Sequence, residues 1–320
     1  MDFGGGFSRI PKDPDRGHIS ISPAQHVPHT QSGCILQGNR SVSDHVYPID
    51  PDSLLTDTKA ARALGSAHAA QYQSGEPYHH ICIDNFLPQP VIDGVLADLA
   101  QLPEPESSFS RAQENLKSSY IPERLPSFTK NLFYAFNSRP FLLFLEEMTG
   151  IPGLIPDPYF SGAGIHKTLN GGHLDIHADF NLHGQMRVER RLNVLIYLNR
   201  NWQEDWGGSF EVWDKEMSKK MASFVPTYNR MVCFSTGSDT FHGNPEPVNH
   251  PDGEPRQSIA LYYYTATWDD TRKEHTTLFK PRPGTADKAD RVIARRAFLQ
   301  DILPPVLYRK IGYKLRRIGF

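Results

Sequence analysis

One short stretch of the chain combines metal-binding residue types with a period of two. The segment 171–181 reads GGHLDIHADFN and places His173, Asp175, His177 and Asp179 at alternate positions. A β-strand would project all these side chains from one face. Imidazoles and carboxylates are costly to bury together unless a cation compensates them, and a divalent metal does so directly. The stretch therefore predicts a metal site.

Spacing alone does not choose between the two histidine-x-aspartate pairs in this stretch, because each offers one nitrogen and one oxygen ligand. A third ligand must come from elsewhere in the chain. Downstream, an apolar run in 231–243 leads through a short polar turn to His242. Two histidines and one carboxylate form the triad that suits non-haem Fe(II) and leaves coordination positions open.

An arginine opens the next strand-like run. Arg256 begins RQSIALYYY, which is rich in strong β-formers. By strand parity Arg256 and Ser258 point to the same side. A buried guanidinium needs an anionic partner. A bidentate carboxylate ligand would serve, and so would a structural ion pair.

Together these residues resemble the iron(II)- and 2-oxoglutarate-dependent dioxygenases, in their prolyl-hydroxylase-like branch. The resemblance spans residues 78–268 and includes the segments RLNVLIYLN at 191–199, WGGSFEVW at 206–213, PTYNRMVCF at 226–234 and RQSIALYYY at 256–264. A histidine-x-aspartate pair alone would be a weak indication. The occurrence of all these pieces in order makes the resemblance specific.

The resemblance implies which residues bind the metal. In the family a leucine stands three residues before the ligand histidine, and Leu174 has that position relative to His177. We therefore expect His177, Asp179 and His242 to be the catalytic centre and to hold Fe(II). The other histidine-x-aspartate pair is then expected beside these ligands or near the mouth of the site.

The resemblance also implies the cofactors and the reaction. We expect 2-oxoglutarate as co-substrate and O2 as oxidant, with a place for ascorbate as an additional reductant. Arg256, helped by Ser258 and Tyr197, is expected to bind the distal carboxylate of 2-oxoglutarate. The reaction would hydroxylate a C–H bond and release succinate and CO2. The target is expected to be a prolyl residue of a peptide, with a free amino acid, lipid or glycan nearly as plausible, because fold and iron site do not fix the substrate.

The pattern around these residues predicts the fold. From residue 158 the chain consists of short β-runs punctuated by Gly, Asn and Pro over about a hundred residues. We predict a β-dominated α+β protein with a double-stranded β-helix, a jelly-roll or cupin-like fold, at 158–270. A helical support region with a leading strand is expected at 53–157. Its predicted elements are helices at 53–73, 89–102, 125–136 and 140–149 and a strand at 78–88.

The two ends differ from this core in composition. Residues 1–52 are rich in Gly, Pro, Ser and His without periodicity, which predicts a flexible N-terminal segment. Residues 271–320 are expected to be a helical, basic C-terminal extension. Its last part, VLYRKIGYKLRRIGF, carries basic but no acidic residues, so as an amphipathic helix it would contact an acidic partner or a membrane surface, or else present a solvated face.

Composition narrows the function classes. The net charge of −2 gives no electrostatic reason to expect nucleic acid as a partner. The cysteines Cys34, Cys82 and Cys233 are too scattered for a disulfide framework, which favours a reducing compartment. The N-terminus lacks the apolar core of a signal peptide, and no apolar run is long enough for a transmembrane segment. We therefore expect a cytoplasmic enzyme acting on a peptide or small molecule.

Two alternatives compete with an oxygenase. One is a metal-binding jelly roll without oxygenase activity, such as a zinc protein, and the other is a degenerate barrel that serves as an interaction module. Arg256 and Tyr197 disfavour the first, and an intact triad disfavours the second. His166 and His183 are further candidates for the substrate side of the site.

Overall fold

One antiparallel sheet dominates the part of the chain that the computed structural model describes, which is residues 46–103, 108–109, 111–266, 275–285 and 287. The strand order is β1 (His80–Ile83), β9 (Met231–Ser235), β6 (Glu189–Tyr197), β11 (Arg256–Thr265), β5 (Gly164–Ala178), β10 (Phe241–Asn244), β7 (Phe210–Trp213) and β8 (Lys220–Phe224).

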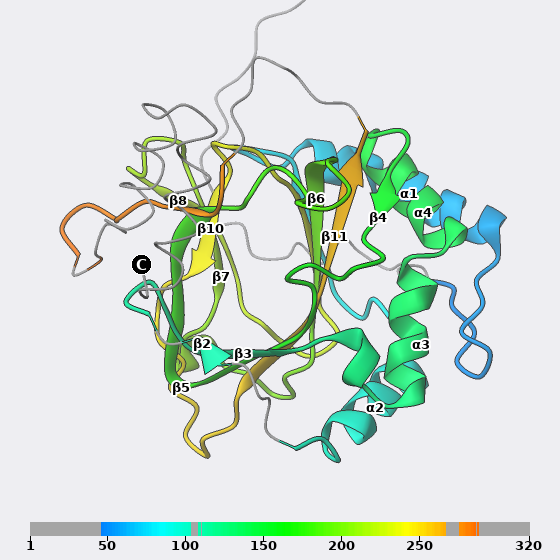
Figure 1. Cartoon of the computed structure of the whole chain (residues 1–320), viewed down its shortest axis with the longest axis horizontal. Helices are drawn as coiled ribbons and strands as arrows, with labels where there is room; N and C mark the ends of the chain where they lie inside the picture. Colours follow the sequence, from blue (N-terminus) through cyan, green and yellow to red (C-terminus); the bar gives the residue numbers. More distant parts are fainter. Residues whose placement is uncertain (1–45, 104–107, 110, 267–274, 286, 288–320) are drawn as a thin grey trace, which may run out of the picture. The chain divides into compact units, whose positions relative to one another are not determined.

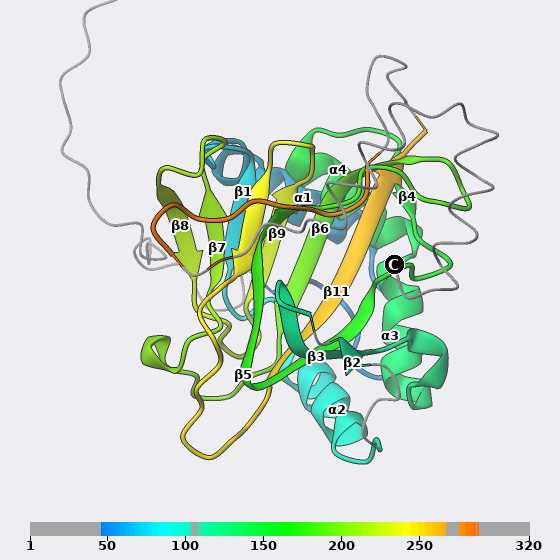
Figure 2. The same ribbon diagram turned by 60° about the vertical axis from the view of Figure 1, so that its left-hand side comes forward.

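The long strand β5 belongs to both halves of this sheet. Its first residues pair with β11, with Ala260 opposite Gly164, and its last residues pair with β10, with His242 opposite His177. The sheet therefore turns over on itself, so that β6 and β11 lie across an interior from β10 and β7 (Figure 1; Figure 2). This arrangement confirms the predicted double-stranded β-helix.

Shorter strands extend the sheet. They are β2 (Ser108–Phe109), β3 (Glu114–Tyr120), β4 (Ile155–Pro156) and β12 (Leu278–Phe279). β3 pairs with β5, and its polar sequence ENLKSSY gave no strand prediction. β12 pairs with the other end of β5, where Phe279 lies opposite His177. Both strands therefore border the segment that carries the predicted metal ligands.

Helices cover the outer side of β6 and β11 (Figure 1). They are α1 (Thr58–Gln73), α2 (Gln89–Leu99), α3 (Ser127–Phe136) and α4 (Arg139–Thr149), with short 3₁₀ helices at Pro122–Arg124 and Glu204–Trp206. α4 ends at Gly150 with φ +71°, as its sequence predicts. α1 begins later than predicted, because Asp57 caps it by accepting a hydrogen bond from the amide of Ala60.

The strand β6 separates the core from the interior of the barrel. Its residues Leu192, Val194 and Ile196 are fully buried in the same apolar cluster as helical residues such as Phe136 and Phe144. Its alternate residues belong to the opposite face. The aliphatic face therefore packs against the helices, and Asn193 and Tyr197 are left for the interior.

Two predicted boundaries need correction. Tyr47 and Ile49 are buried, and the Tyr47 ring packs against Phe86, so the flexible segment expected at 1–52 does not reach these residues. The aromatic ring of Tyr47 has a place in the core, which composition alone did not reveal. The extension at 271–320 contains the strand β12 rather than helix where it is described. Residues 1–45 and 288–320, with the predicted basic helix, lie outside the described residues.

No helix among the described residues is long and apolar enough to cross a membrane.

Candidate metal centre

Pairing of β5 with β10 brings two histidines together. His242 lies directly opposite His177, and the ring centroids are 4.7 Å apart. Directly opposed residues of antiparallel strands share one face of the sheet. Both histidines are buried.

Hydrogen bonds to the backbone fix how these rings are turned. The Nδ1 atom of His177 lies 2.8 Å from the carbonyl oxygen of Asp175, and that of His242 lies 3.1 Å from the carbonyl oxygen of Thr240. A carbonyl oxygen only accepts, so each Nδ1 carries the proton. The Nε2 atoms keep their lone pairs, which a metal requires.

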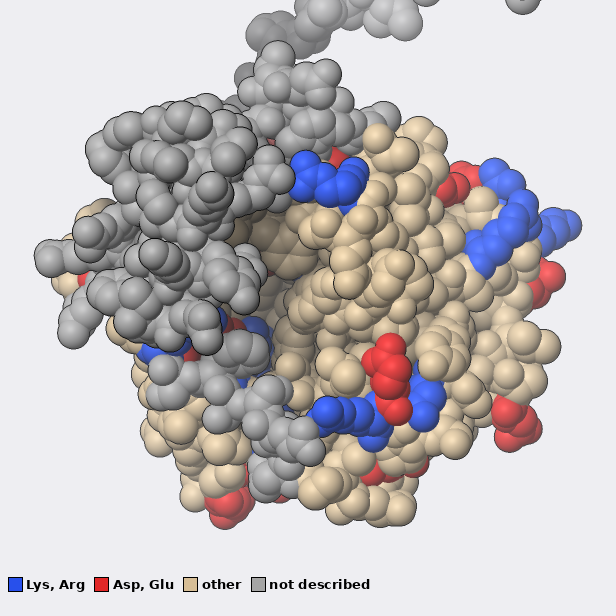
Figure 3. Space-filling view, in the orientation of Figure 1, with Lys and Arg blue, Asp and Glu red and all other residues tan. Residues whose placement is uncertain are grey.

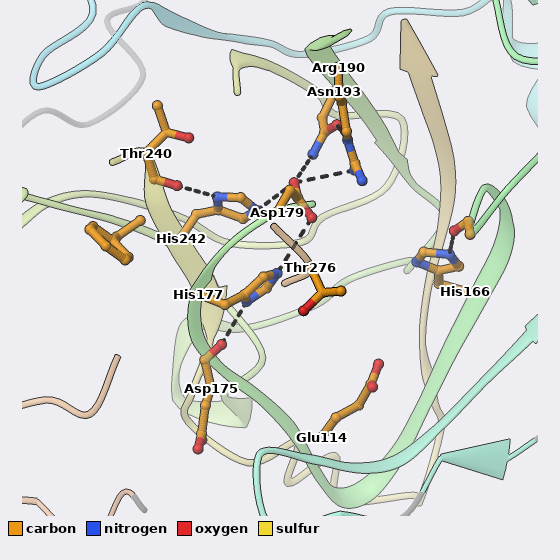
Figure 4. A network of polar contacts seen from close by, with 12 residues as sticks. Glu114, His166, Asp175, His177, Asp179, Arg190, Asn193, Thr240, His242 and Thr276 are labelled. Carbon is orange, nitrogen blue, oxygen red and sulfur yellow. Dashed lines mark hydrogen bonds and ion pairs between the residues drawn. The ribbon is translucent and has the colours of Figure 1, made fainter. Parts of the chain in front are cut away.

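Both Nε2 atoms face Asp179, which follows the end of β5 (Figure 4). The distance is 3.8 Å from His177 Nε2 to Oδ1 and 3.2 Å from His242 Nε2 to Oδ2. One ligand atom from each of His177, Asp179 and His242 lies within 4.8 Å of the others. Two neutral nitrogens and one carboxylate fit the donor set of Fe(II).

Electrostatics keep both residue types in the form that binds metal. Burial, with a smaller contribution from His242, lowers the pKa of His177 to about 4 against the opposing effect of Asp179. Burial alone would raise the pKa of Asp179, but Arg190 and the histidines hold it well below its usual value. The histidine is therefore neutral and the carboxylate ionised near neutral pH.

Two residues of β6 hold Asp179 from behind. Asn193 donates from Nδ2 to Asp179 Oδ2 at 2.7 Å, and Nη2 of Arg190 lies 3.2 Å from the same oxygen. The sequence had given no reason to assign a role to Asn193 or Arg190. Strand parity places Asn193 on the face of Tyr197, which was the only indication that it would reach the site.

His173 and Asp175 form a separate pair. His173 Nε2 lies 3.5 Å from Asp175 Oδ1 and 3.3 Å from the carbonyl oxygen of Ala112. The carboxylate of Asp175 points away from His177 (Figure 4). Burial, with a smaller effect of Asp287, raises the pKa of Asp175 to about 6.

A β-bulge explains why the four alternating residues do not share one site. His242 pairs with His177, but Asn244 pairs with Leu174, so β5 has one residue more than β10 over this interval. An extra residue shifts the alternation of faces along the strand. The expectation that all four side chains share a face is therefore wrong.

Arg256 lies in a second polar region of the interior. It is buried, its Nε donates to the carbonyl oxygen of Gly208 at 2.7 Å, and its Nη2 is 3.4 Å from the Tyr197 hydroxyl. Gly208 has φ +68°, and a Cβ there would lie 2.9 Å from Arg256 Cδ, so only glycine allows this close approach. Within the described residues, Arg256 has no acidic partner.

The other residues expected to bind co-substrate accompany Arg256. Ser258 pairs with Tyr197 across β11 and β6, so their side chains share a face. Burial raises the pKa of Tyr197 to about 12, which keeps its hydroxyl protonated. Tyr197 packs in one cluster with Phe210 and Phe234, and both of these rings also contact His242. An apolar wall therefore connects Arg256 to the histidines.

A hollow opens on this face of the molecule, with basic side chains near its rim (Figure 3). His166 lies on β5 near this interior and its Nε2 contacts the Gly162 carbonyl oxygen at 2.9 Å (Figure 4). His183 is fully buried, 3.3 Å from Asp157, so it does not line an open substrate side. His250 packs against Trp206.

The comparison with protein families identifies the barrel. Residues 163–264 match the family model described as the 2OG-Fe(II) oxygenase superfamily. The matched segment contains all the residues expected to bind metal and co-substrate. The superfamily that the motifs resemble is thereby confirmed.

Several solved structures are similar to the chain. A prolyl hydroxylase from Trichoplax adhaerens, in complex with a hypoxia-inducible factor peptide fragment, shares 18% identity over 64% of this chain and 91% of its own, with a TM-score of 0.48. A prolyl-4-hydroxylase from Pseudomonas putida shares 15% over 63% and 100%, with a TM-score of 0.43. HygX from Streptomyces hygroscopicus, with nickel and 2-oxoglutarate bound, shares 10% over 69% and 92%, with a TM-score of 0.43. No curated protein sequence matches the chain significantly.

Proposed function

We propose that the chain is a 2-oxoglutarate-dependent dioxygenase, because residues 163–264 match the model of the 2OG-Fe(II) oxygenase superfamily, and that its residues divide the work as follows. His177, Asp179 and His242 hold Fe(II), and Arg256, Tyr197 and Ser258 bind 2-oxoglutarate. The reaction hydroxylates a C–H bond of the substrate and releases succinate and CO2. Bound iron and 2-oxoglutarate supply the activation of O2, which no side chain can provide.

The environment of Arg256 is the observation that carries the co-substrate assignment. Burying a guanidinium is unfavourable unless a carboxylate compensates the loss of hydration. Burial accordingly lowers the pKa of Arg256. A carboxylate ligand would restore the balance through paired hydrogen bonds. The protonated hydroxyl of Tyr197, 3.4 Å from Nη2, is placed to donate to the same carboxylate.

The rest of the interior orients the co-substrate and excludes water. Phe210 and Phe234 bridge the space between Tyr197 and His242, so a dicarboxylate with one end at Arg256 would run along an apolar wall toward the histidines. Fixing both ends of the co-substrate limits the geometries that must be searched before reaction.

The substrate is proposed to be a prolyl residue of a peptide, which the motif resemblance makes the first target to test. A free amino acid, a lipid or a glycan is tested next, because barrel and metal site leave the substrate open.

An anaerobic titration tests the proposal. Fe(II) and 2-oxoglutarate added together to the purified protein should produce a weak visible absorption band, and admission of O2 should then yield succinate. Arg256→Met should need far more 2-oxoglutarate to develop the band. Absence of the band, combined with tight binding of zinc, would contradict the proposal and favour a metal-binding barrel without oxygenase activity.

A further inference from the structure

The two oxygens of Asp179 have different surroundings. Oδ2 receives the amide of Asn193 at 2.7 Å and faces Nη2 of Arg190 at 3.2 Å. Nε2 of His242, a proposed metal ligand, lies 3.2 Å from the same oxygen. Among the described residues, the nearest polar side-chain atom recorded for Oδ1 is Nε2 of His177, 3.8 Å away.

Asn193 and Arg190 are themselves held by further contacts. Nε of Arg190 donates to Oδ1 of Asn193 at 2.9 Å, which closes a ring of contacts with Asp179 (Figure 4). The guanidinium of Arg190 lies 4.4 Å from the centre of the Phe180 ring and 3.6 Å from that of Tyr262. Arg190 and Asn193 are only 2% and 3% exposed. Neither Asn193 nor Arg190 can turn away from Asp179 without losing a second contact.

We infer that Arg190 and Asn193 are positioning residues that fix the orientation of the Asp179 carboxylate relative to His177 and His242. This inference rests on the proposed role of His177, Asp179 and His242 in binding Fe(II). A carboxylate that neighbouring residues already hold in place needs no reorientation when the metal binds, so loss of these contacts should weaken metal binding.

Two substitutions remove contacts to Asp179 without changing the net charge of the protein. Asn193→Ala removes the 2.7 Å donor without changing the net charge. Arg190→Lys keeps the charge but loses the planar fork that reaches Asn193 and Asp179 together. Loss of a partner that orients a metal ligand typically weakens metal binding about 10- to 100-fold.

Asn199→Ala is the matched control. Asn199 lies two residues beyond β6 and is also a buried asparagine, with its amide donating to the carbonyl oxygens of Pro226 and Gln257 at 2.6 Å and 3.1 Å. Its loss should lower the thermal midpoint of the metal-free protein as the loss of Asn193 does. It should leave metal affinity unchanged, because none of its contacts involves Asp179.

The experiment measures Mn(II) binding to the purified full chain by electron paramagnetic resonance of the free ion, followed by 2-oxoglutarate binding at saturating Mn(II). We expect Asn193→Ala and Arg190→Lys to weaken Mn(II) binding about 10- to 100-fold and 2-oxoglutarate binding as well. Affinities of both variants within about threefold of the unsubstituted protein, at a lowered thermal midpoint, would reduce the two residues to a structural role and overturn the inference.

The same titration distinguishes this inference from the proposed function beneath it. If the unsubstituted protein binds no Mn(II), or binds it as tightly after His242→Ala, the metal centre itself is refuted. If His242→Ala abolishes binding and the two positioning variants do not weaken it, only the positioning role of Arg190 and Asn193 fails.

Discussion

β5 carries the same short pattern twice, and the two copies have different surroundings. His173 and Asp175 pair with each other at 3.5 Å beside β3, with side chains 21% and 9% exposed. His177 and Asp179 lie 3.8 Å apart beside β10, with side chains 7% and 12% exposed. The exposures are similar, so burial does not separate the two pairs.

The neighbouring strands make the difference. β10 places His242 opposite His177, whereas β3 places Asn115 opposite His173. Arg190 and Asn193 contact the Asp179 carboxylate directly, whereas Asp175 forms an ion pair with His173 and is affected by the charge of Arg282. A histidine-x-aspartate pair therefore acquires the surroundings of a metal site from its cross-strand partners and not from its own spacing.

The largest expected effect comes from removing one carboxylate of each pair. Asp179→Ala should abolish succinate formation, with a loss well beyond the roughly 100-fold typical of residues that only orient a ligand. Asp175→Ala should retain most activity because its carboxylate points away from His177. The assay must be free of added carboxylates, which could replace the missing ligand. Activity lost in Asp175→Ala and kept in Asp179→Ala would reverse the comparison.

A second, smaller effect concerns Arg256, which shares the interior with the His177 pair. Arg256→Met should raise the 2-oxoglutarate concentration needed for half-maximal turnover roughly 30-fold or more, since losing one partner of a buried charge pair costs about 2 kcal/mol at least. Arg62→Met, which breaks an ion pair with Glu147 between α1 and α4, serves as control. An unchanged requirement for 2-oxoglutarate would move the carboxylate site elsewhere.

Metal removal provides a third test. A metal at about 100 times its dissociation constant should stabilise the protein by about 2.7 kcal/mol over the chelated form. Chemical denaturation with and without Mn(II) should show this increment in the unsubstituted protein and in His173→Ala. His242→Ala should lack it. An equal loss of the increment in His173→Ala would mean that both pairs take part in metal binding.

The smallest effect is expected for His173 itself. Its recorded polar partners are the carbonyl oxygen of Ala112 at 3.3 Å and the carboxylate of Asp175. Loss of one hydrogen bond costs about 0.5–1.5 kcal/mol, so His173→Gln should shift the denaturation midpoint only slightly and leave metal affinity unchanged. A loss of several kcal/mol would show that this pair has a role the static contacts do not reveal.

Elements with a strong local sequence pattern could be predicted, and elements without one could not. RLNVLIYLN alternates strictly, so β6 and the faces of Val194 and Tyr197 were predicted from the period alone. Gly150 predicted the end of α4 because its left-handed conformation is costly for other residues. β3 has no such alternation, and its polar residues form a strand because β5 is there to pair with it.

The residues available for the chemistry can be read from the amino-acid sequence: His177, Asp179, His242 and Arg256 lie in a β-rich region of recognisable motifs. Side-chain chemistry and the period of a strand are local properties, which a sequence states directly.

How these residues are used depends on the closed sheet. A one-residue bulge in β5 separates the side chain of Asp175 from that of His177, and β6, which β11 separates from β5 in the sheet, brings Arg190 and Asn193 to Asp179. Register and cross-strand contacts depend on how the whole sheet closes. No single strand contains that information.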